Sequence, residues 1–486
     1  MALDGRKRWL ALLVLCFGDL MIVLDSTIVN VALPSIRADL GFSETSLAWV
    51  VNAYLLTFGG FLLLGGRLGD LFGHRRLFLA GIGVFTLASL ACGLATSQEF
   101  LIAARAVQGL GGAVVSVVAL SLIMILFTGE AERARAMGIV GFVLSGGGTA
   151  GVLLGGVLTD VLDWHWIFLV NLPVGVAVLA LCLTLLPSGQ TMGQRGRLDI
   201  AGAVTVTASL MLAVYAIVNG NEAGWGSGQT IGLLAAAAVL LALFLAIEAR
   251  VSSPLMPLGL FRLRNISTAN ALGVLMAGAM FGWFFLSALY LQLVLAYSPL
   301  EVGLGFLPAT VLWGASSIAL SDRLVMRFGI KLPLVGGLLL FVFGLVLFAR
   351  APADGNFALD VLPGMLVMGI GGGITFNPLL LAAMGDVAPT EAGLASGIVN
   401  TAFMMGGALG LAVLASLAAS RTDSLLESGD GRLVALTGGY HAAFLAGAAF
   451  AVLAAALGAL LLRPAAPPAP EAAEAAGAAA GASGGR

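Results

Sequence analysis

Fourteen separate apolar stretches, divided by Gly, Pro or charged breaks, are the feature that most limits what this chain can fold into. The hydrocarbon core of a bilayer is about 30 Å thick, and an α-helix of roughly 20 apolar residues crosses it. With 60% hydrophobic and only 10% charged residues, the 486-residue chain has too little polar surface to cover a soluble globule. The sequence therefore predicts an all-α integral membrane protein. The fourteen transmembrane helices are expected near residues 9–33, 46–66, 76–96, 100–127, 134–160, 164–187, 199–219, 229–249, 267–296, 302–322, 331–350, 358–382, 393–420 and 440–462.

The distribution of basic residues predicts how these helices are oriented. Loops on the cytoplasmic side of a membrane carry an excess of Lys and Arg. An N-terminal cluster, Arg6 to Arg8, places the first helix with its start in the cytoplasm, and fourteen spans return the C-terminus to that side. With this topology, 18 of the 23 basic residues are cytoplasmic. Arg105 is an exception, because it lies inside the fourth predicted helix.

A loop motif is repeated in the two halves of the chain. The segment Arg67-Leu-Gly-Asp-Leu-Phe-Gly-His-Arg75 returns 256 residues later as Arg323-Leu-Val-Met-Arg-Phe-Gly-Ile-Lys331. Transporters built from repeated halves bind substrate between them near the midplane and rock one half against the other. The repeat therefore indicates a carrier with six helices, two extra helices and six more. The corresponding segments are a first bundle at 1–188, an insert at 189–264, a second bundle at 265–463 and a disordered cytoplasmic tail at 464–486.

Two carboxylates, Asp19 and Asp25, fall inside the first predicted helix. A charge at bilayer depth costs at least roughly 2.5–3.5 kcal/mol, so it usually marks a substrate pathway or a proton relay. Asp25 lies roughly 24 Å along its helix and Arg105 roughly 7 Å into the fourth helix from the other side, so the two can meet. A carboxylate balanced between burial and a nearby arginine can bind and release a proton. The alternatives are a carboxylate that reaches the interface and a static ion pair.

Two glycine-containing motifs have both functional and structural interpretations. The loop between the second and third helices contains Gly66, Asp70, Gly73, Arg75 and Arg76. Its charges can form a gate whose pairs differ between conformations, or they can simply tether the loop. The fifth helix contains closely spaced glycines, which permit either ordinary close packing or a flexible helix between the halves. These glycines are Gly148, Gly151, Gly155 and Gly156.

The second half carries few polar residues at bilayer depth, and none of them is charged. The residues are Tyr290, Gln292, Asn377 and Asn400. A mostly apolar pocket with a few polar groups suits hydrophobic ligands, although each of these side chains can equally make an interhelical hydrogen bond. The chain has no phosphate-binding loop and no His-Glu-x-x-His motif, and its net charge of −2 gives no reason to expect nucleic acid. The sequence predicts no catalytic residue, cofactor or metal.

These motifs resemble the major facilitator superfamily, and within it the fourteen-helix drug:proton antiporter branch. The resemblance covers the chain except its tail. The matching segments are Leu24 to Pro34, Gly66 to Arg76, Arg105 to Gly112, Gly148 to Gly156, Trp164 to Pro173, Tyr290 to Gln292, Pro308 and Ser396 to Thr401. The resemblance implies a major-facilitator-type fold. It also implies that Asp25 takes a proton or a cationic substrate and that Arg105 is its relay or partner.

The chain departs from the family motifs at two positions. Leu71 stands where the loop motif usually has a basic residue, and Val152 where the helix 5 motif usually has proline. Asp19 is not part of the signature and is a candidate second site for protons or a cationic drug. With Asn30, Tyr290, Gln292, Asn377 and Asn400, it forms the predicted substrate-binding set.

The sequence thus predicts an antiporter in the bacterial cytoplasmic membrane. Protons are the coupling ion, and the exported substrates are amphipathic, hydrophobic and often cationic drugs. The family implies a monomer whose partners are substrate and the lipid bilayer. A dedicated exporter of one secondary metabolite, acting in self-resistance, is the close alternative. A proton-coupled importer and a membrane enzyme or sensor are weaker ones.

Overall fold

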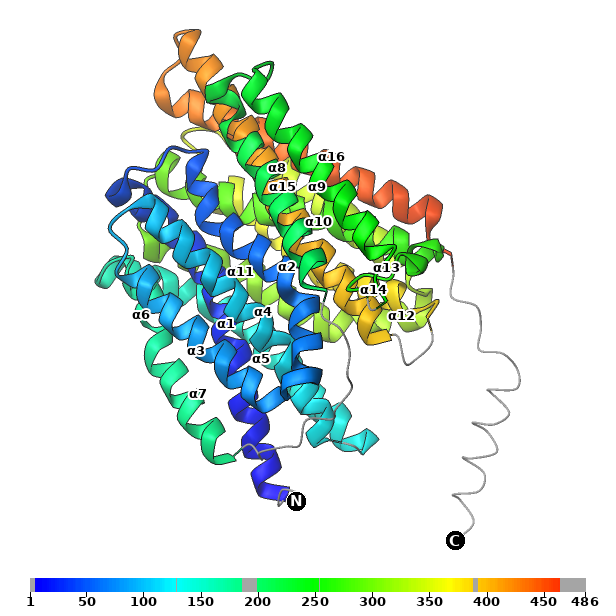
Figure 1. Ribbon diagram of the computed structural model, residues 1–486. Helices are drawn as coiled ribbons and strands as arrows, with labels where there is room; N and C mark the ends of the chain where they lie inside the picture. The colour runs from blue at the N-terminus through cyan, green and yellow to red at the C-terminus, as the bar shows by residue number, and fades with distance from the viewer. Residues whose placement is uncertain (1–4, 128, 186–198, 253, 388–391, 464–486) are drawn as a thin grey trace.

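The computed structural model describes residues 5–127, 129–185, 199–252, 254–387 and 392–463. The predicted tail at 464–486 and the predicted boundary near 188 lie outside the described residues. Within them the chain folds into sixteen α-helices (Figure 1). They are α1 (Gly5–Leu40), α2 (Trp49–Phe72), α3 (His74–Gly93), α4 (Gln98–Leu126), α5 (Glu130–Val161), α6 (Trp166–Leu169), α7 (Asn171–Leu185), α8 (Ile200–Ala223), α9 (Gly228–Glu248), α10 (Arg264–Leu289), α11 (Pro299–Ser316), α12 (Asp322–Phe328), α13 (Lys331–Phe348), α14 (Leu362–Met384), α15 (Ala392–Glu427) and α16 (Arg432–Leu461).

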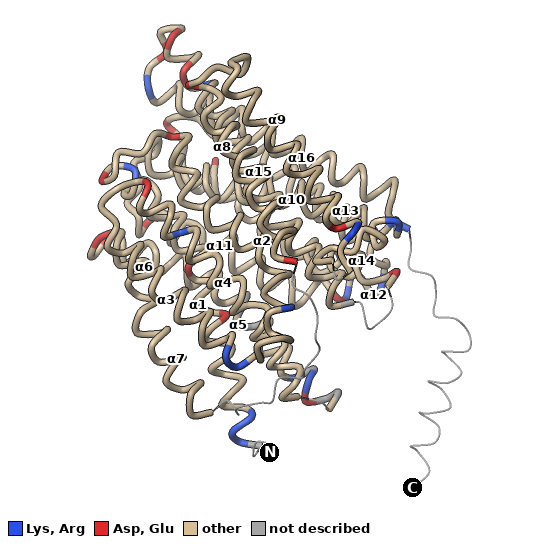
Figure 2. The backbone as a smooth tube through the Cα atoms, in the orientation of Figure 1, with Lys and Arg blue, Asp and Glu red and all other residues tan. Residues whose placement is uncertain are grey.

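These helices form fourteen apolar spans in the described part of the chain, which is the predicted number. Some spans combine two elements: α6 and α7 make one, and α11 and α12 are joined through a π-helical turn at Ser317–Ser321. Charged residues gather toward the helix ends and leave long uncharged stretches between them (Figure 2). Below, the side of the bundle where α1 begins is called the N-terminal side and the other the opposite side.

Several predicted helix bounds were wrong in the same direction. The first helix was expected to end at residue 33, but α1 continues through Pro34 to Leu40. The last helix was expected to begin at residue 440, but α16 begins at Arg432, and α15 extends past 420 to Glu427. Hydropathy marks only the apolar part of a helix, whereas backbone hydrogen bonding continues into the polar residues beyond it.

The two loop motifs of the repeat share a glycine with positive φ. Gly73 is the single residue between α2 and α3, with φ of 90°, and Gly329 follows α12 with φ of 74°. Residues other than glycine rarely adopt this left-handed region. The repeat in the sequence therefore extends to the φ angle of this glycine, whereas ψ differs, at 125° for Gly73 and −179° for Gly329.

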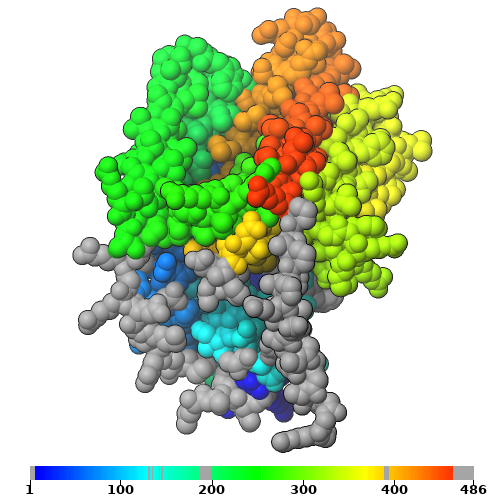
Figure 3. Space-filling model, turned by 90° about the vertical axis from the view of Figure 1, so that its right-hand side faces the viewer, coloured from blue at the N-terminus to red at the C-terminus, as the bar shows by residue number. Residues whose placement is uncertain are grey.

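Helices of the two halves meet in two seams. At one, α5 packs against α11; at the other, α2 packs against α15. The inserted helices α8 and α9 pack on each other, and α8 also contacts α2 and α15. Figure 3 shows this pair in green at one edge of the molecule.

Candidate proton and substrate sites

Asp25 lies on α1 and is completely buried. Close packing on one side of α1 fixes its position. Gly151 of α5 lies so close to α1 that an added β-carbon would be 3.0 Å from the carbonyl oxygen of Leu24, and one on Gly155 would be 2.6 Å from that of Ile28. The other side of α1 contacts α4 and α7, and the Asp25 carboxylate is bound by side chains of these two helices.

Arg105 of α4 pairs directly with this carboxylate. Its Nη1 is 2.5 Å from Asp25 Oδ2, and both side chains are at most 1% exposed. Gln108 Nε2 donates to Asp25 Oδ1 at 2.6 Å, and Asn171 Nδ2 donates to the same oxygen at 3.1 Å. A buried carboxylate is stable only when it is paired and hydrogen-bonded, and both carboxylate oxygens of Asp25 meet this condition.

The guanidinium of Arg105 is held on several sides. Its Nε donates to the carbonyl of Val50 at 2.9 Å, and Nη1 also donates to Gln108 Oε1 at 2.7 Å. The ring centroids of Tyr54 and Phe168 lie 4.4 and 5.5 Å from its central carbon. Aromatic faces attract a desolvated cation, so the site stabilises positive charge even apart from Asp25.

A serine of α3 completes the cluster around Asp25. We call this cluster the acid network; its members are Asp25, Ser89, Arg105, Gln108 and Asn171. Ser89 of α3 accepts a hydrogen bond from Gln108 Nε2 at 2.7 Å. The backbone of α4 approaches its neighbours through glycine. An added β-carbon on Gly109 would be 2.5 Å from the carbonyl oxygen of Tyr54, and one on Gly111 would be 2.7 Å from the amide of Phe85.

The structure thus places the two residues singled out in the sequence, Asp25 and Arg105, in direct contact. Sequence reasoning did not assign a role to Gln108, Asn171 or Ser89. Gln108 lies one turn after Arg105 in the same quoted motif, so helical spacing could have identified it. Asn171 also stands inside a quoted segment, but Ser89 carries no sequence signal that separates it from other serines.

Asp19 does not join the acid network. Its side chain is 7% exposed and makes no hydrogen bond or ion pair within the described part of the chain. Asn30, predicted with it for substrate binding, donates to the backbone carbonyls of Ser26 and Thr27 in its own helix at 3.3 Å. Asp19 is therefore a buried carboxylate that no described residue pairs with.

The loop motif between α2 and α3 is ordered around Gly73. Arg75 donates to the carbonyl of Leu183 in α7 at 2.8 Å, so it joins two helices of the first half. Arg76 is exposed, and Gly66 packs against Val117 of α4. The side chain of Asp70, the predicted acidic partner in this gate, lies outside the described part of the structure.

The glycines of α5 face two different neighbours. Gly151 and Gly155 contact α1 as described above. Gly156 meets the second half, where an added β-carbon would be 2.7 Å from the carbonyl oxygen of Pro299 and 3.3 Å from the Cα of Gly303 in α11. Gly148 faces open space. The predicted motif therefore combines packing within the first half with a contact between the halves.

The polar residues predicted in the second half do not form one cluster. Tyr290 Oη donates to the carbonyl of Pro352 at 2.6 Å, and Gln292 Nε2 donates across the halves to the carbonyl of Val31 at 2.7 Å. Asn377 Nδ2 lies 3.4 Å from Ser317 Oγ, and Asn400 is partly exposed.

Aromatic rings gather elsewhere in the second half. The ring of Phe403 on α15 lies 6.2 Å from that of Phe281 on α10 and 5.6 Å from that of Phe376 on α14. Phe281 and Phe376 are partly exposed. These three residues, called the aromatic cluster below, bring an apolar surface from three helices together.

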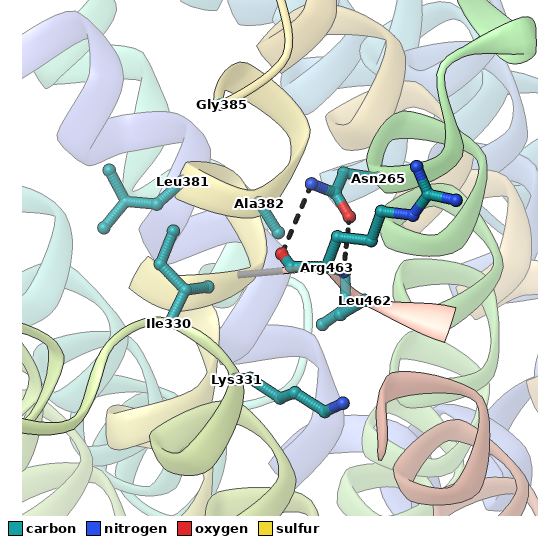
Figure 4. Close-up of a pocket in the computed structure, with 8 residues that line it drawn as sticks. All are labelled: Asn265, Ile330, Lys331, Leu381, Ala382, Gly385, Leu462 and Arg463. Atoms are coloured by element: carbon teal, nitrogen blue, oxygen red, sulfur yellow. Dashed lines mark hydrogen bonds between the residues drawn. The ribbon is translucent and has the colours of Figure 1, made fainter. Parts of the chain in front are cut away.

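Two pockets lie away from the acid network and from the aromatic cluster. Figure 4 shows the first, on the N-terminal side of the second half, where Asn265 and the backbone of Arg463 hydrogen-bond to each other. It encloses only about 10 Å³, which is too small for a drug. The second, of about 380 Å³ on the opposite side, is lined by residues that include Arg37, Glu44 and Asp423. Neither contains Asp25, Asp19 or the aromatic cluster.

The fold and sequence together identify the class of protein. Residues 15–411 match the model of the Major Facilitator Superfamily. The chain belongs to this family and is a multi-pass membrane transporter. Among solved structures, a bacterial homolog of the human lysosomal transporter Spinster, in an inward-facing and occupied conformation, has a TM-score of 0.66 over 96% of this chain and all of that one, at 17% identity.

More similar relatives are proteins of antibiotic resistance and export. The puromycin resistance protein pur8 of Streptomyces alboniger is 39% identical over 94% of this chain and 90% of its own length. The cephamycin export protein CmcT of Amycolatopsis lactamdurans is 41% identical over 85% of each chain. The multidrug resistance protein Stp of Mycobacterium tuberculosis is 38% identical over 87% of this chain and 78% of its own.

Proposed function

We propose that this chain is a proton-coupled antiporter that exports amphipathic, often cationic, drugs across the bacterial cytoplasmic membrane. One observation carries the proposal: a fully buried Asp25–Arg105 pair at the centre of the first half. Membrane proteins retain ionisable groups at such depth mainly where ions, protons or substrates pass. The similarity to antibiotic resistance and export proteins supports drugs as the cargo.

Protonation gives the pair two arrangements. When Asp25 is ionised, it binds Arg105, Gln108 and Asn171. When it takes a proton, its attraction for Arg105 falls, while Arg105 keeps the carbonyl of Val50 and the ring of Tyr54. Because α1, α2, α4 and α7 supply these groups, the balance between the two arrangements also shifts helix positions. That difference is what couples a proton to alternating access.

Asp19 and the aromatic cluster have the chemistry needed to bind an amphipathic cation. Asp19 is a buried carboxylate without a described partner, so it can receive the positive charge of a cationic drug. The aromatic cluster of Phe281, Phe376 and Phe403 offers an apolar surface for the rest of the molecule. Of the other predicted substrate contacts, Asn377 and Asn400 are partly exposed and can supply polar groups. Asn30, Tyr290 and Gln292 already donate to backbone carbonyls.

The remaining assignments concern orientation and gating. The excess of basic residues at the N-terminal side makes that side cytoplasmic, with both termini there. Exposed Arg76 on the α2–α3 loop can reach acidic groups as the halves close, whereas Arg75 holds α3 to α7. The chain works as a monomer, because one chain supplies both halves of the fold.

A dedicated exporter of one antibiotic is the second candidate. Two relatives bear the names of single antibiotics, puromycin and cephamycin, whereas a third is named for multidrug resistance. The two candidates differ only in breadth of substrate. Both export by the same coupling through Asp25.

The test is drug-induced proton release from energised everted vesicles. A panel of lipophilic cations and neutral antibiotics is added to vesicles that contain the wild type, Asp25→Asn or Glu99→Gln. Glu99 is an exposed carboxylate at the start of α4, the helix that carries Arg105, so its variant is the matched control. We expect proton release with the wild type and the control, and none with Asp25→Asn.

The outcomes separate the candidates. Release with many compounds supports a multidrug antiporter, and release with one compound supports a dedicated exporter. Release by Asp25→Asn equal to that of the wild type would remove Asp25 from coupling and leave Asp19 as the remaining candidate. Absence of release with every compound would contradict drug:proton antiport.

A further inference from the structure

A second pair of buried carboxyls lies in the inserted helices, far along the chain from the acid network. Asp199 caps the start of α8, and Glu248 is the last residue of α9. Their side chains are 6% and 3% exposed. Both belong to the N-terminal side of the bundle, and the proposed function above uses neither of them.

Each carboxyl has one satisfied oxygen and one unsatisfied oxygen. Asp199 Oδ1 accepts from the amide of Gly202 at 2.7 Å, and Glu248 Oε2 accepts from the amide of Met256 at 3.1 Å. Asp199 Oδ2 and Glu248 Oε1 are buried and have no donor among the described residues. A buried acceptor without a donor costs about 1–3 kcal/mol, and more when it is charged.

The two unsatisfied oxygens face the same small space. A β-carbon added to Gly202 would lie 2.6 Å from Asp199 Oδ2 and 2.9 Å from Glu248 Oε1. Both oxygens therefore lie beside the same point, and a hydrogen bond between them would give each a partner. An ionised carboxylate can only accept hydrogen bonds, so this contact requires a proton on one of the two residues.

No basic residue of the described chain lies where it could pair with the two unsatisfied oxygens. The helix α2 faces this region with apolar Leu64, and its Arg67 is exposed; the side chain of Asp70 lies outside the described residues. Arg250, which follows α9, is exposed as well. In α15, the first charged residue is Arg421, near the far end of the helix. No Lys, Arg or His of the described chain pairs with either carboxyl.

We propose that Asp199 and Glu248 form a proton-binding site that holds one proton between Asp199 Oδ2 and Glu248 Oε1. The proton comes from water and returns to it. While bound, it makes one carboxyl a donor and leaves the other as the acceptor, so both unsatisfied oxygens gain a partner. A hydrogen bond between an acid and its carboxylate is short and strong. Without the proton, two buried anions face each other and repel.

The site has a structural consequence for the insert. The proton joins the start of α8, the end of α9 and the segment through Met256 that leads to α10. Leu64 of α2, Ala203 of α8 and Leu255 pack together beside it. Because α8 also contacts α15 of the second half, the proton ties the insert to both halves of the transporter. Loss of the proton loosens this connection on the N-terminal side.

The test measures the bound proton itself and needs no transport. Infrared difference spectra of the purified protein are recorded during a titration to alkaline pH, for the wild type, Glu248→Gln, Asp199→Asn and Glu222→Gln. In each single variant of the pair, the new amide can donate to the remaining carboxylate, so the contact is kept without a titrating proton. Glu222 is an exposed acid at the other end of α8 and gives the control.

We expect one protonated-carboxyl band to be lost from both Glu248→Gln and Asp199→Asn and kept in Glu222→Gln. Loss of the same band from both variants identifies one proton shared by the two residues. A band that survives in both variants, or that only one of them removes, would overturn the proposal. If one variant fails to fold, survival of the band in the other would still overturn the proposal, and the stability measurement below gives the second test. Failure of drug:proton antiport would leave this result unchanged.

The stability of the folded protein provides a second readout. The folded state keeps a proton that the carboxyls of the unfolded chain release at about pH 4. Raising the pH from there to the pH at which the folded pair gives up its proton therefore lowers the stability of the wild type. Glu248→Gln has no shared proton to lose. We expect its thermal unfolding temperature to fall less than that of the wild type as the pH is raised from acidic to alkaline values. An equal fall in both would count against the shared proton.

Discussion

The two halves of this transporter share a loop motif but differ in the side chains that fill their interiors. In the first half, the acid network joins α1, α3, α4 and α7 through charged and polar groups. In the second half, buried Trp283 packs against the rings of Phe306, Phe341 and Phe348 at 5.8, 6.3 and 6.0 Å. In the described residues of the second half no charged side chain is buried, so helices of this kind pack without a pair like Asp25–Arg105. The comparison supports the proposal that the pair serves function rather than architecture.

The largest expected effect comes from removing one charge of the pair. Asp25→Leu leaves the buried guanidinium of Arg105 without its counter-charge, which costs about 3–5 kcal/mol. We expect a large fall in the thermal unfolding temperature of the purified protein. Asp25→Leu combined with Arg105→Leu resembles the apolar centre of the second half and should recover most of the stability but not export. A double variant as unstable as the single would contradict the comparison.

A substitution between the halves tests a different contact. Gly156→Val places branched carbon where α5 meets the backbone of Pro299 and Gly303. Overpacking of this kind costs about 1–3 kcal/mol, and we expect vesicles with this variant to lose drug export. Gly148→Ala is the matched control because its side chain enters open space. Export by Gly156→Val at the wild-type rate would show that the halves do not depend on this contact.

A smaller effect is expected from a neutral member of the acid network. Gln108→Leu removes a donor to Asp25 and an acceptor for Arg105, and leaves both charges in place. The loss should be about 1–3 kcal/mol in unfolding free energy. The pH at which export is half-maximal should also move, because one of the donors that stabilise ionised Asp25 is missing. An unchanged pH profile with normal stability would exclude Gln108 from the coupling machinery.

The smallest expected effect sharpens the role of the second half. Phe376→Ala removes one ring of the aromatic cluster, and an aromatic pair contributes about 0.5–1.5 kcal/mol beyond burial. We expect the KM for hydrophobic drugs to rise about two- to tenfold, while the maximal rate stays near that of the wild type. Asp25→Asn should instead lower the rate for every drug. A uniform loss of rate in Phe376→Ala would place this cluster in coupling rather than in substrate binding.

Much of the fold was predictable because membranes impose strict lengths and compositions. The number of spans follows from the apolar stretches, and the positive φ at both Gly73 and Gly329 follows from the repeated motif. The end of α1 and the start of α16 were predicted wrongly, because hydropathy does not mark where a helix continues into water.

The candidate site was predictable only where a charge stood out against apolar surroundings. Asp25 and Arg105 could be paired from their depths alone. Ser89 and Asn171 could not be assigned, because a neutral polar residue fits a helix on any face and its role depends on how the helices are rotated. The Asp199–Glu248 pair was also missed. Its members stand 49 residues apart at helix ends, where carboxylates are usually exposed.

The placement of α8 has a consequence for how lipid-dissolved molecules reach the protein. This helix packs on both α2 and α15, so it covers the line along which one side of the two halves meets. For a drug that diffuses within the bilayer, α8 therefore blocks access to the seam between α2 and α15. At the other seam, where α5 meets α11, neither α8 nor α9 packs in the same way. Lateral entry from the membrane is therefore expected from one side of the transporter only.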